Sequence, residues 1–160
     1  LFGYYTAEGY ARKEIDFWNL HMRSLLLHTN RFESEIVSTS NRPRGIVPEE
    51  LKNASKKMEN CLTVLFCIEK DDTEKQLNLL YESIIKDALQ IGVLNIMIAP
   101  FVHLSYNIAS PQLAKELYQL LLNKLKETNF TVDYDYFGYS KSWIMDIKGH
   151  RCAYKYREFN

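Results

Sequence analysis

Cysteine, proline and glycine are scarce in this chain, and no long apolar run is present. The 160 residues include 3 cysteines, 4 prolines and 6 glycines. An odd number of cysteines with no Cys-x-x-Cys pair argues against a disulfide framework and favours reduced thiols. No apolar stretch reaches the roughly 18–20 residues that a membrane helix needs, and residues 1–21 do not resemble a signal peptide. We therefore expect a cytoplasmic protein with no membrane partner.

An excess of either charge sign is also missing. Lysine plus arginine and aspartate plus glutamate number 20 each, so the net charge is zero. A strongly basic nucleic-acid-binding protein is therefore not indicated, although RNA contact over a small surface or with a partner's help stays open. Apolar material is plentiful, because 46% of the residues are hydrophobic. That fraction suits one globular domain with a single core.

Short apolar runs predict buried strands at three places before the C-terminal third of the chain. They begin at Met22 ("MRSLLLH") and span residues 61–70 ("CLTVLFCIEK") and 93–99 ("VLNIMIA"). The last stretch, from Phe130 onwards, predicts two or three further strands with turns or bulges at its glycines. Short turns between these late strands favour antiparallel pairing.

Two helices are predicted between the strands. Thr73 and Gln76 form a capping box before an apolar helical stripe that ends at Gly92, which predicts a helix over 73–91. Ser110 as N-cap before a proline predicts a second helix, to about residue 128. A strand–helix–strand crossover requires parallel pairing. The predicted fold is therefore α/β (α+β), a mixed β-sheet with two helices packed on one face.

Two segments are harder to interpret. Residues 1–21 are rich in aromatic side chains without a clean period, and they form either an extension of unknown role or an element that packs on the domain. Residues 29–60 contain charges and turn formers, which suggests a loop beside a site. Within it, Pro48 is placed to begin a short helix through Met58. The domain itself is expected to span 22–158.

His103 and Lys141 are the strongest candidates for chemistry. His103 follows the carboxyl end of a predicted central strand, where ligands gather in open α/β sheets. Lys141 follows Gly138, a position that lets backbone approach a ligand, and its charge suits a developing oxyanion. The alternatives are a packed histidine that hydrogen-bonds to backbone and an edge-strand lysine that discourages aggregation.

Other polar residues carry weaker signals. His28, His150 and Cys152 together with His103 raise a zinc hypothesis, but no second paired ligand motif supports it, so we expect no metal and no cofactor. Glu69 ends a predicted strand, and its acidic and basic neighbours favour a solvated charge. Nucleophile-elbow, P-loop and dinucleotide motifs are absent.

Several motifs in order carry a resemblance to a known family. The pieces "MRSLLLHTNRFE", "CIEK", "APFVHLSYNIASP" and "FGYSKSWIMDIKGH" resemble the editing domain of archaeal threonyl-tRNA synthetase, which is similar in fold to D-aminoacyl-tRNA deacylase. The resemblance runs from about Met22 to Ala153. It implies an aminoacyl-tRNA deacylase that proofreads by hydrolysing the ester of seryl-tRNA(Thr).

The resemblance also implies a site. The family's catalytic histidine and lysine correspond to His103 and Lys141. The residues that would line the substrate pocket are Pro100, Phe101, Val102, Ile68, Glu69, Ser140 and Tyr154. Ser140 and Tyr154 are departures, because the family usually has tyrosine and glutamate there, and Arg151 stands where proline is usual. These departures keep open a non-catalytic module that helps a synthetase to bind tRNA or to dimerise, and a free-standing D-aminoacyl-tRNA deacylase is a further alternative.

The expected partners follow from the same resemblance. They are the acceptor end of tRNA(Thr) and the catalytic part of the synthetase, in cis or in trans. The acceptor end is expected at the basic stretch 141–158, with Lys155 as a phosphate contact. A homodimer is expected because the aromatic stretch "VDYDYFGY" would leave apolar surface exposed on a monomer.

Overall fold

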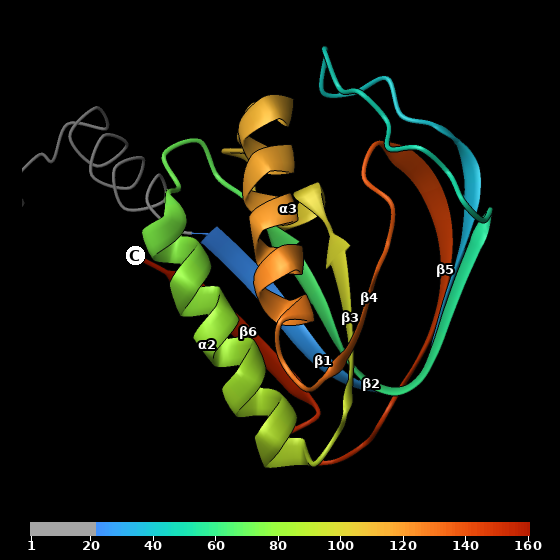
Figure 1. Cartoon of the computed structure of the whole chain (residues 1–160), viewed down its shortest axis with the longest axis vertical. Helices are drawn as coiled ribbons and strands as arrows, with labels where there is room; N and C mark the ends of the chain where they lie inside the picture. Colours follow the sequence, from blue (N-terminus) through green and yellow to red (C-terminus); the bar gives the residue numbers. More distant parts are fainter. Residues whose placement is uncertain (1–21) are drawn as a thin grey trace, which may run out of the picture.

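A computed structural model describes residues 22–160 of the chain (Figure 1). The predicted extension over residues 1–21 lies outside the described part. The elements in chain order are β1 (Met22–Thr39), β2 (Ser55–Cys67), α2 (Glu74–Ile91), β3 (Asn95–Pro100), the 3-10 helix η1 (Val102–Leu104), α3 (Pro111–Lys126), β4 (Thr131–Tyr134), β5 (Tyr139–Ile147) and β6 (Tyr154–Phe159). Within these residues no helix is long and apolar enough to cross a membrane.

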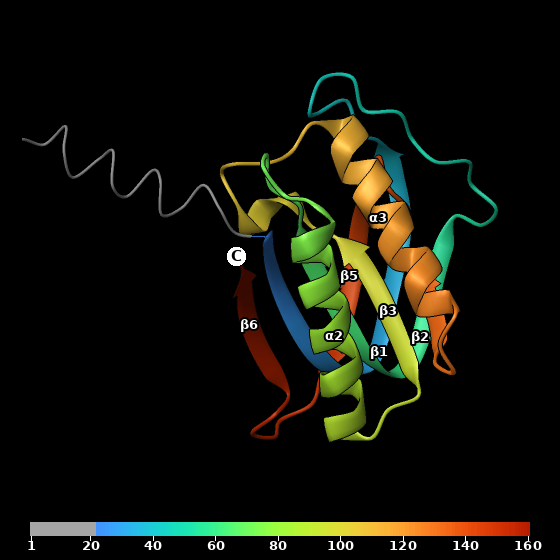
Figure 2. The same ribbon diagram turned by 60° about the vertical axis from the view of Figure 1, so that its left-hand side comes forward.

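The strands form one mixed sheet in the order β4-β3-β2-β1-β5, with β6 also paired to β1 (Figure 2). β2, β3 and β4 are parallel, and β1 is antiparallel to β2, β5 and β6. Along one edge, the long β1 pairs with two strands. Its residues Met22–Leu27 pair with β6, and Thr29–Thr39 pair with β5. The late strands therefore do not pair with one another as their short turns suggested: β5 and β6 are antiparallel to β1, and β4 is parallel to β3.

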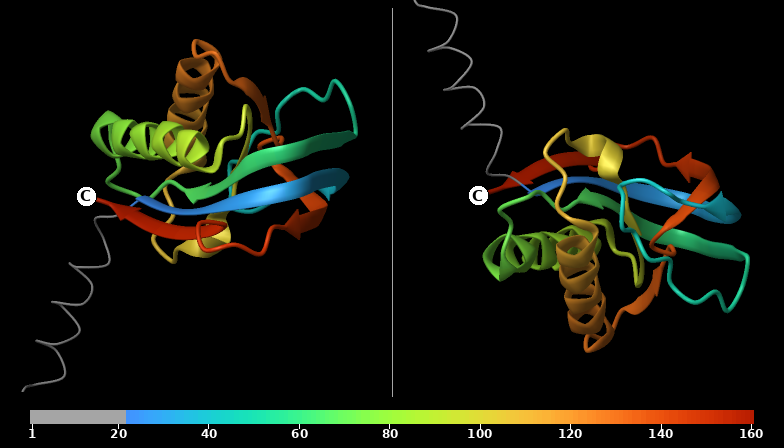
Figure 3. Two further views of the ribbon diagram at one scale, coloured as in Figure 1. Left: turned by 90° about the horizontal axis from the view of Figure 1, so that it is seen from below. Right: turned by 90° about the horizontal axis from the view of Figure 1, so that it is seen from above.

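Both helices cover one face of the sheet, which confirms the predicted fold class (Figure 3). The predicted caps are present: Thr73 and Gln76 bond reciprocally, Gly92 is left-handed at φ 71°, and the Ser110 side chain accepts from the amide of Leu113. The buried stripes of the two helices pack against apolar residues of β1, β2 and β3. The main core therefore lies between the helices and the sheet.

The helix expected from Pro48 to Met58 is wrong, because residues 48–54 belong to the loop of a hairpin and residues 55–58 begin its second strand. β1 continues to Thr39 and β2 begins at Ser55, so the connecting loop is only residues 40–54. Charged side chains face one another across this hairpin, as in the pair of Lys57 and Glu33, whose Nζ and Oε1 atoms lie 3.6 Å apart. Such cross-strand pairs stabilise strands in a sequence whose local composition also suits a helix.

Candidate functional site

A pocket of about 590 Å³ opens at the carboxyl end of β3. Three segments meet there: the end of β3 with η1, the β1–β2 loop, and the entrance to β5. The described residues that line it are 40–43, Ile46, 100–103, Ile108, 137–141 and Trp143. None of these lining residues is acidic. Of the predicted loop segment 29–60, residues 40–43 and Ile46 line this pocket, whereas residues up to 39 and from 55 onwards are strand.

The structure brings together six of the nine residues expected at the site. Pro100, Phe101, Val102, His103, Ser140 and Lys141 all line the pocket.

The other three lie outside it. Ile68 belongs to the main core, and Tyr154 is 55% exposed on β6. Glu69 is fully buried, with its Oε1 3.0 Å from Nε of Arg23, so the interpretation of Glu69 as a solvated charge is wrong. The isolated bridge from Glu69 to Ile108 fixes the loop that leaves η1.

His103 stands at the pocket surface on η1. This short helix begins where the backbone amide of Phe101 donates to the carbonyl of Phe66 on β2, at 2.8 Å. The His103 side chain is exposed, and its ring lies edge-on to Phe101 with centroids 5.2 Å apart. Phe101 in turn contacts Trp143, also at 5.2 Å. An imidazole in solvent contact, backed by an aromatic wall, is free to bind a substrate hydroxyl or a water molecule.

Lys141 is held at the inner wall of the same pocket. Its ammonium donates to the backbone carbonyl of Tyr136 at 2.6 Å and lies 3.7 Å from Oδ2 of Asp135. The Lys141 side chain is only 9% exposed. Burial lowers the pKa of Lys141, and the charge of Asp135 opposes that shift. The ammonium is therefore neutralised within the fold and does not project freely toward solvent.

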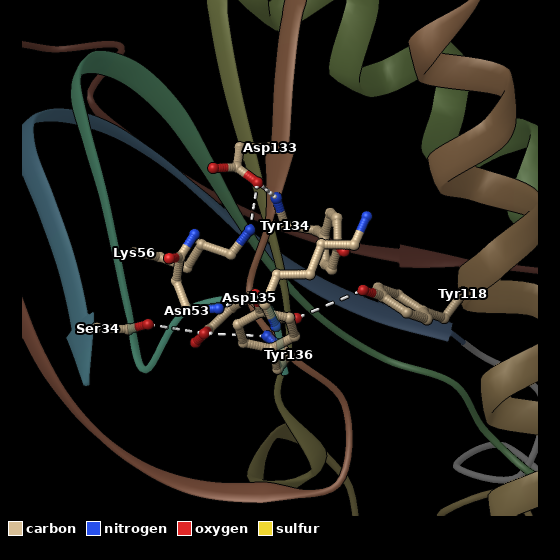
Figure 4. Close-up of polar contacts among 9 residues, drawn as sticks. Ser34, Asn53, Lys56, Tyr118, Asp133, Tyr134, Asp135 and Tyr136 are labelled. Atoms are coloured by element: carbon tan, nitrogen blue, oxygen red, sulfur yellow. Dashed lines mark hydrogen bonds and ion pairs between the residues drawn. The ribbon is translucent and has the colours of Figure 1, made fainter. Parts of the chain in front are cut away.

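Asp135 is the centre of a buried polar network that sequence reasoning missed. Its carboxylate accepts from Ser34 Oγ at 2.7 Å, from Trp143 Nε1 at 2.7 Å and from the amide of Tyr136 at 3.1 Å. Figure 4 shows this environment, with the Tyr118 hydroxyl donating to the Asp135 carbonyl. The network links β1 and β5 through the Asp135 carboxylate and α3 through the Asp135 backbone carbonyl. It thereby fixes two pocket residues, Lys141 and Trp143.

The β1–β2 loop is fastened to the strand entrance opposite it. The amide of Ser40 donates to the carbonyl of Gly138, the amide of Glu49 donates to that of Phe137, and the Tyr139 hydroxyl donates to the carbonyl of Glu49. Gly138 has φ +89°, and a Cβ there would lie 2.6 Å from Cα of Pro48. The close backbone approach that Gly138 permits is therefore an approach to Pro48 of this loop.

Two of the candidate zinc ligands, His28 and His150, lie side by side away from the pocket. Nδ1 of His28 lies 2.7 Å from Nε2 of His150, and the amide of Cys152 donates to the other nitrogen of His150. His103 is in the pocket. Within residues 22–160 no three histidine, cysteine or acidic side chains are grouped to hold a metal ion.

The basic stretch 141–158 is divided by the fold. Lys155 and Arg157 both bind the buried carboxylate of Asp87 on α2, each with a nitrogen 2.9 Å from Oδ1. Lys141 is engaged by Asp135. These three cations therefore stabilise contacts between elements, and they do not form one continuous free basic surface.

Fold and pocket together define an α/β domain with a candidate ligand site at the carboxyl edge of its parallel strands. Residues 22–159 match the family model described as the archaea-specific editing domain of threonyl-tRNA synthetase. The chain belongs to this family, as its motifs suggested.

The relatives are long ligases of which this chain resembles a part. It is 35% identical over 132 residues to a threonine–tRNA ligase of Methanococcus aeolicus, covering 81% of this chain and 20% of the ligase. A Pyrococcus horikoshii threonine–tRNA ligase is 34% identical over 136 residues, covering 82% of this chain and 21% of the ligase. The chain thus spans about a fifth of the length of these relatives.

A solved structure shares the fold at low sequence identity. The c-Myc DNA unwinding element binding protein aligns with a TM-score of 0.63 and 13% identity, over 86% of this chain and 99% of that one. This likeness bears on the fold alone.

Proposed function

We propose that this domain hydrolyses the ester of mischarged seryl-tRNA(Thr), releasing serine and tRNA. The observation that carries the proposal is the pocket at the β3 edge, lined by His103, in a chain of the editing-domain family. The physical need is clear, because serine and threonine differ by one methyl group. One such group in a binding pocket gives only about 10–200-fold discrimination, so a synthetase needs a second, hydrolytic site.

The proposed chemistry needs positioning more than a protein nucleophile. A water molecule attacks the ester carbonyl, and the bond to the ribose oxygen breaks as that oxygen gains a proton. His103 is an exposed group at the pocket surface, and its ring nitrogens can hold the water or the ribose hydroxyls. Pro100, Phe101 and Val102 supply rigid walls at the strand end. Such placement contributes to rate through orientation and through stabilisation of developing charge.

Of the departures from the family pattern at Ser140, Tyr154 and Arg151, only Ser140 falls in the pocket. Ser140 lines it, whereas Tyr154 lies on β6 outside it. The substitution at Tyr154 therefore removes no group from the pocket wall. This supports the catalytic proposal over the alternative of a non-catalytic module.

The test is deacylation of seryl-tRNA(Thr) and threonyl-tRNA(Thr) by the 160-residue chain. We expect faster loss of serine, and a His103→Ala variant that is about 100-fold slower because one positioned acid–base or hydrogen-bonding group is lost. The matched control is His150→Ala, an exposed histidine outside the pocket. Equal, background-level decay of both substrates would refute the proposal. Selective hydrolysis of D-aminoacyl-tRNA would favour the deacylase alternative.

The partners that follow are proposals of the same kind. The acceptor end of tRNA(Thr) would enter the pocket, and the catalytic part of the synthetase would deliver it in cis or in trans. Because aminoacyl-tRNA is made and used in the cytoplasm, the domain is proposed to act there.

We also infer a homodimer, formed through a surface other than the aromatic stretch expected from the sequence. Tyr136 and Phe137 of the "VDYDYFGY" stretch are buried within the monomer, at 1% and 7% exposure. Exposed aromatic residues instead include Tyr106 and, on β6, Tyr154 and Tyr156. Among the described strands, β6 pairs only with β1. A mass of 18.9 kDa by light scattering at micromolar concentrations would contradict this inference.

A further inference from the structure

We propose that Arg42 on the β1–β2 loop binds the phosphate of the substrate's terminal nucleotide. This inference rests on the proposed function, because it concerns how the same pocket holds an aminoacyl-tRNA end. Arg42 lines the pocket and its side chain is exposed. Among the ion pairs of residues 22–160, none involves Arg42.

The charges around the pocket leave Arg42 as its uncompensated cation. The lining side chains that carry or can acquire positive charge are Arg42, His103 and Lys141. Lys141 is paired with the buried Asp135, and no acidic residue lines the pocket. In a chain with no net charge, this local excess marks the pocket mouth as a site for an anion.

The backbone that carries Arg42 is fixed in place. The Ser40 hydroxyl donates to the carbonyl of Arg42 at 2.7 Å, and the Ser40 amide donates to the carbonyl of Gly138 at 2.9 Å. The loop is thereby attached to the strand that supplies Ser140 and Lys141 to the pocket. A guanidinium on an anchored backbone loses less conformational freedom on binding than one on an unattached loop.

The chemistry of the proposed substrate identifies the anion. The amino acid offers none, because its carboxyl group is the esterified group and its amine is positively charged. The 5′-phosphate of the terminal adenosine is attached to the same ribose that carries the ester. Arginine suits this group because its planar fork donates two parallel hydrogen bonds to phosphate oxygens.

The kinetic test compares two substrates, seryl-tRNA(Thr) and 3′-O-seryladenosine, which lacks the phosphate. For Arg42→Gln we expect KM for seryl-tRNA(Thr) to rise about 10-fold, the scale of one charge-assisted hydrogen bond, while hydrolysis of 3′-O-seryladenosine changes less than about twofold. The dependence of log kcat/KM on log salt should also become shallower by about 0.7, as for one lost phosphate contact.

The matched control is Arg44→Gln, which removes the same charge from the same loop at an exposed position outside the pocket lining. If Arg42→Gln and Arg44→Gln raise KM for seryl-tRNA(Thr) equally, the loop attracts tRNA through diffuse charge and Arg42 makes no specific phosphate contact. Equal losses on both substrates would show that Arg42 supports the pocket wall. No loss on either substrate would also overturn the proposal.

A binding measurement separates this inference from the proposed function. Adenosine 5′-monophosphate and adenosine are titrated into the wild-type chain and into Arg42→Gln. We expect the wild type to prefer the monophosphate about 10-fold and the variant to lose that preference. If the wild type hydrolyses neither ester yet shows this preference, the function fails and the phosphate site stands. If the wild type hydrolyses both esters but binds the monophosphate and adenosine equally, the proposed function stands and the phosphate site is refuted.

Discussion

Lys141 and Asp135 form a buried ion pair, with Nζ of Lys141 3.7 Å from Oδ2 of Asp135 and only 2.6 Å from the carbonyl oxygen of Tyr136. The Asp135 side chain is fully buried, and that of Lys141 is 9% exposed. A lysine whose catalytic role is only a proposal is therefore a part of the scaffold. The proposed catalytic role and the structural role can be separated by experiment.

Replacement of Lys141 by Met is expected to reduce both stability and deacylation. Loss of one partner from a buried pair leaves Asp135 uncompensated, which costs about 3–5 kcal/mol of unfolding free energy. The double variant Lys141→Met with Asp135→Asn removes both charges and should recover part of that loss, because the asparagine keeps one of the two oxygens that accept from Ser34, Tyr136 and Trp143. Urea unfolding and seryl-tRNA(Thr) deacylation are measured on both variants.

The double variant decides what Lys141 does in the site. If the ammonium stabilises charge in the transition state, deacylation stays about 100-fold low even where stability returns. If deacylation returns together with stability, Lys141 is a positioning residue. Full activity of the single variant would contradict both readings.

Replacement of Lys155 by Met is expected to weaken the fold and leave tRNA binding unchanged. Lys155 joins β6 to α2 through Asp87, and hydrogen bonds to charged groups contribute about 1.5–3 kcal/mol. Thermal unfolding should therefore occur at a lower temperature, while the salt dependence of tRNA binding stays the same. Arg151→Gln, an exposed cation of the same stretch, is the control for surface charge. A shallower salt dependence of tRNA binding in Lys155→Met would show instead that Lys155 contacts a phosphate.

Replacement of Gly138 by Ala is expected to disturb the pocket from its rim. The positive φ of +89° disfavours any side chain, and the new Cβ would meet Cα of Pro48 at 2.6 Å. Backbone strain of this kind costs about 1–3 kcal/mol, and relief by moving the loop would displace Arg42. Gly149→Ala is the control, because nothing lies within 4 Å of its Cβ position. Equal unfolding midpoints and equal KM values for the two variants would contradict this reading of the loop.

The stability of the protein should fall as the pH rises toward neutrality, and Asp72 should be a cause. Burial raises the pKa of Asp72 to about 7 from an ordinary value of 3.8. The folded protein therefore keeps a proton that the unfolded chain loses, so this contribution is complete below about pH 4 and is lost as the pH passes about 7.

Asp72→Asn tests this cause, since the amide stays neutral and can still accept from the amide of Glu69. The variant should show a flatter stability curve between pH 4 and 7 in urea unfolding experiments. Asp71→Asn, at the exposed neighbouring position, should keep the slope of the wild type. Parallel curves for the wild type and Asp72→Asn would exclude Asp72 as the source.

Local patterns in the sequence were sufficient for the two helices and for the centres of the strands. The capping box at Thr73, the left-handed Gly92 and the N-cap Ser110 act through neighbouring amides, so their signals lie within a few residues. The position of His103 after a buried strand was equally local, and the ordered motifs were enough to indicate the family that the comparisons show.

The tertiary structure decided what each charge does. The partners of Lys155, Arg23 and Lys56 are Asp87, Glu69 and Asp133, all distant in the chain, and no local pattern pairs them. The sheet likewise extended β1 into residues expected to form a loop and β2 into residues expected to form a helix, because cross-strand partners stabilise the extended form. Which cations remain free at the pocket depends on these distant pairings, since a buried carboxylate neutralises whichever base the fold places beside it.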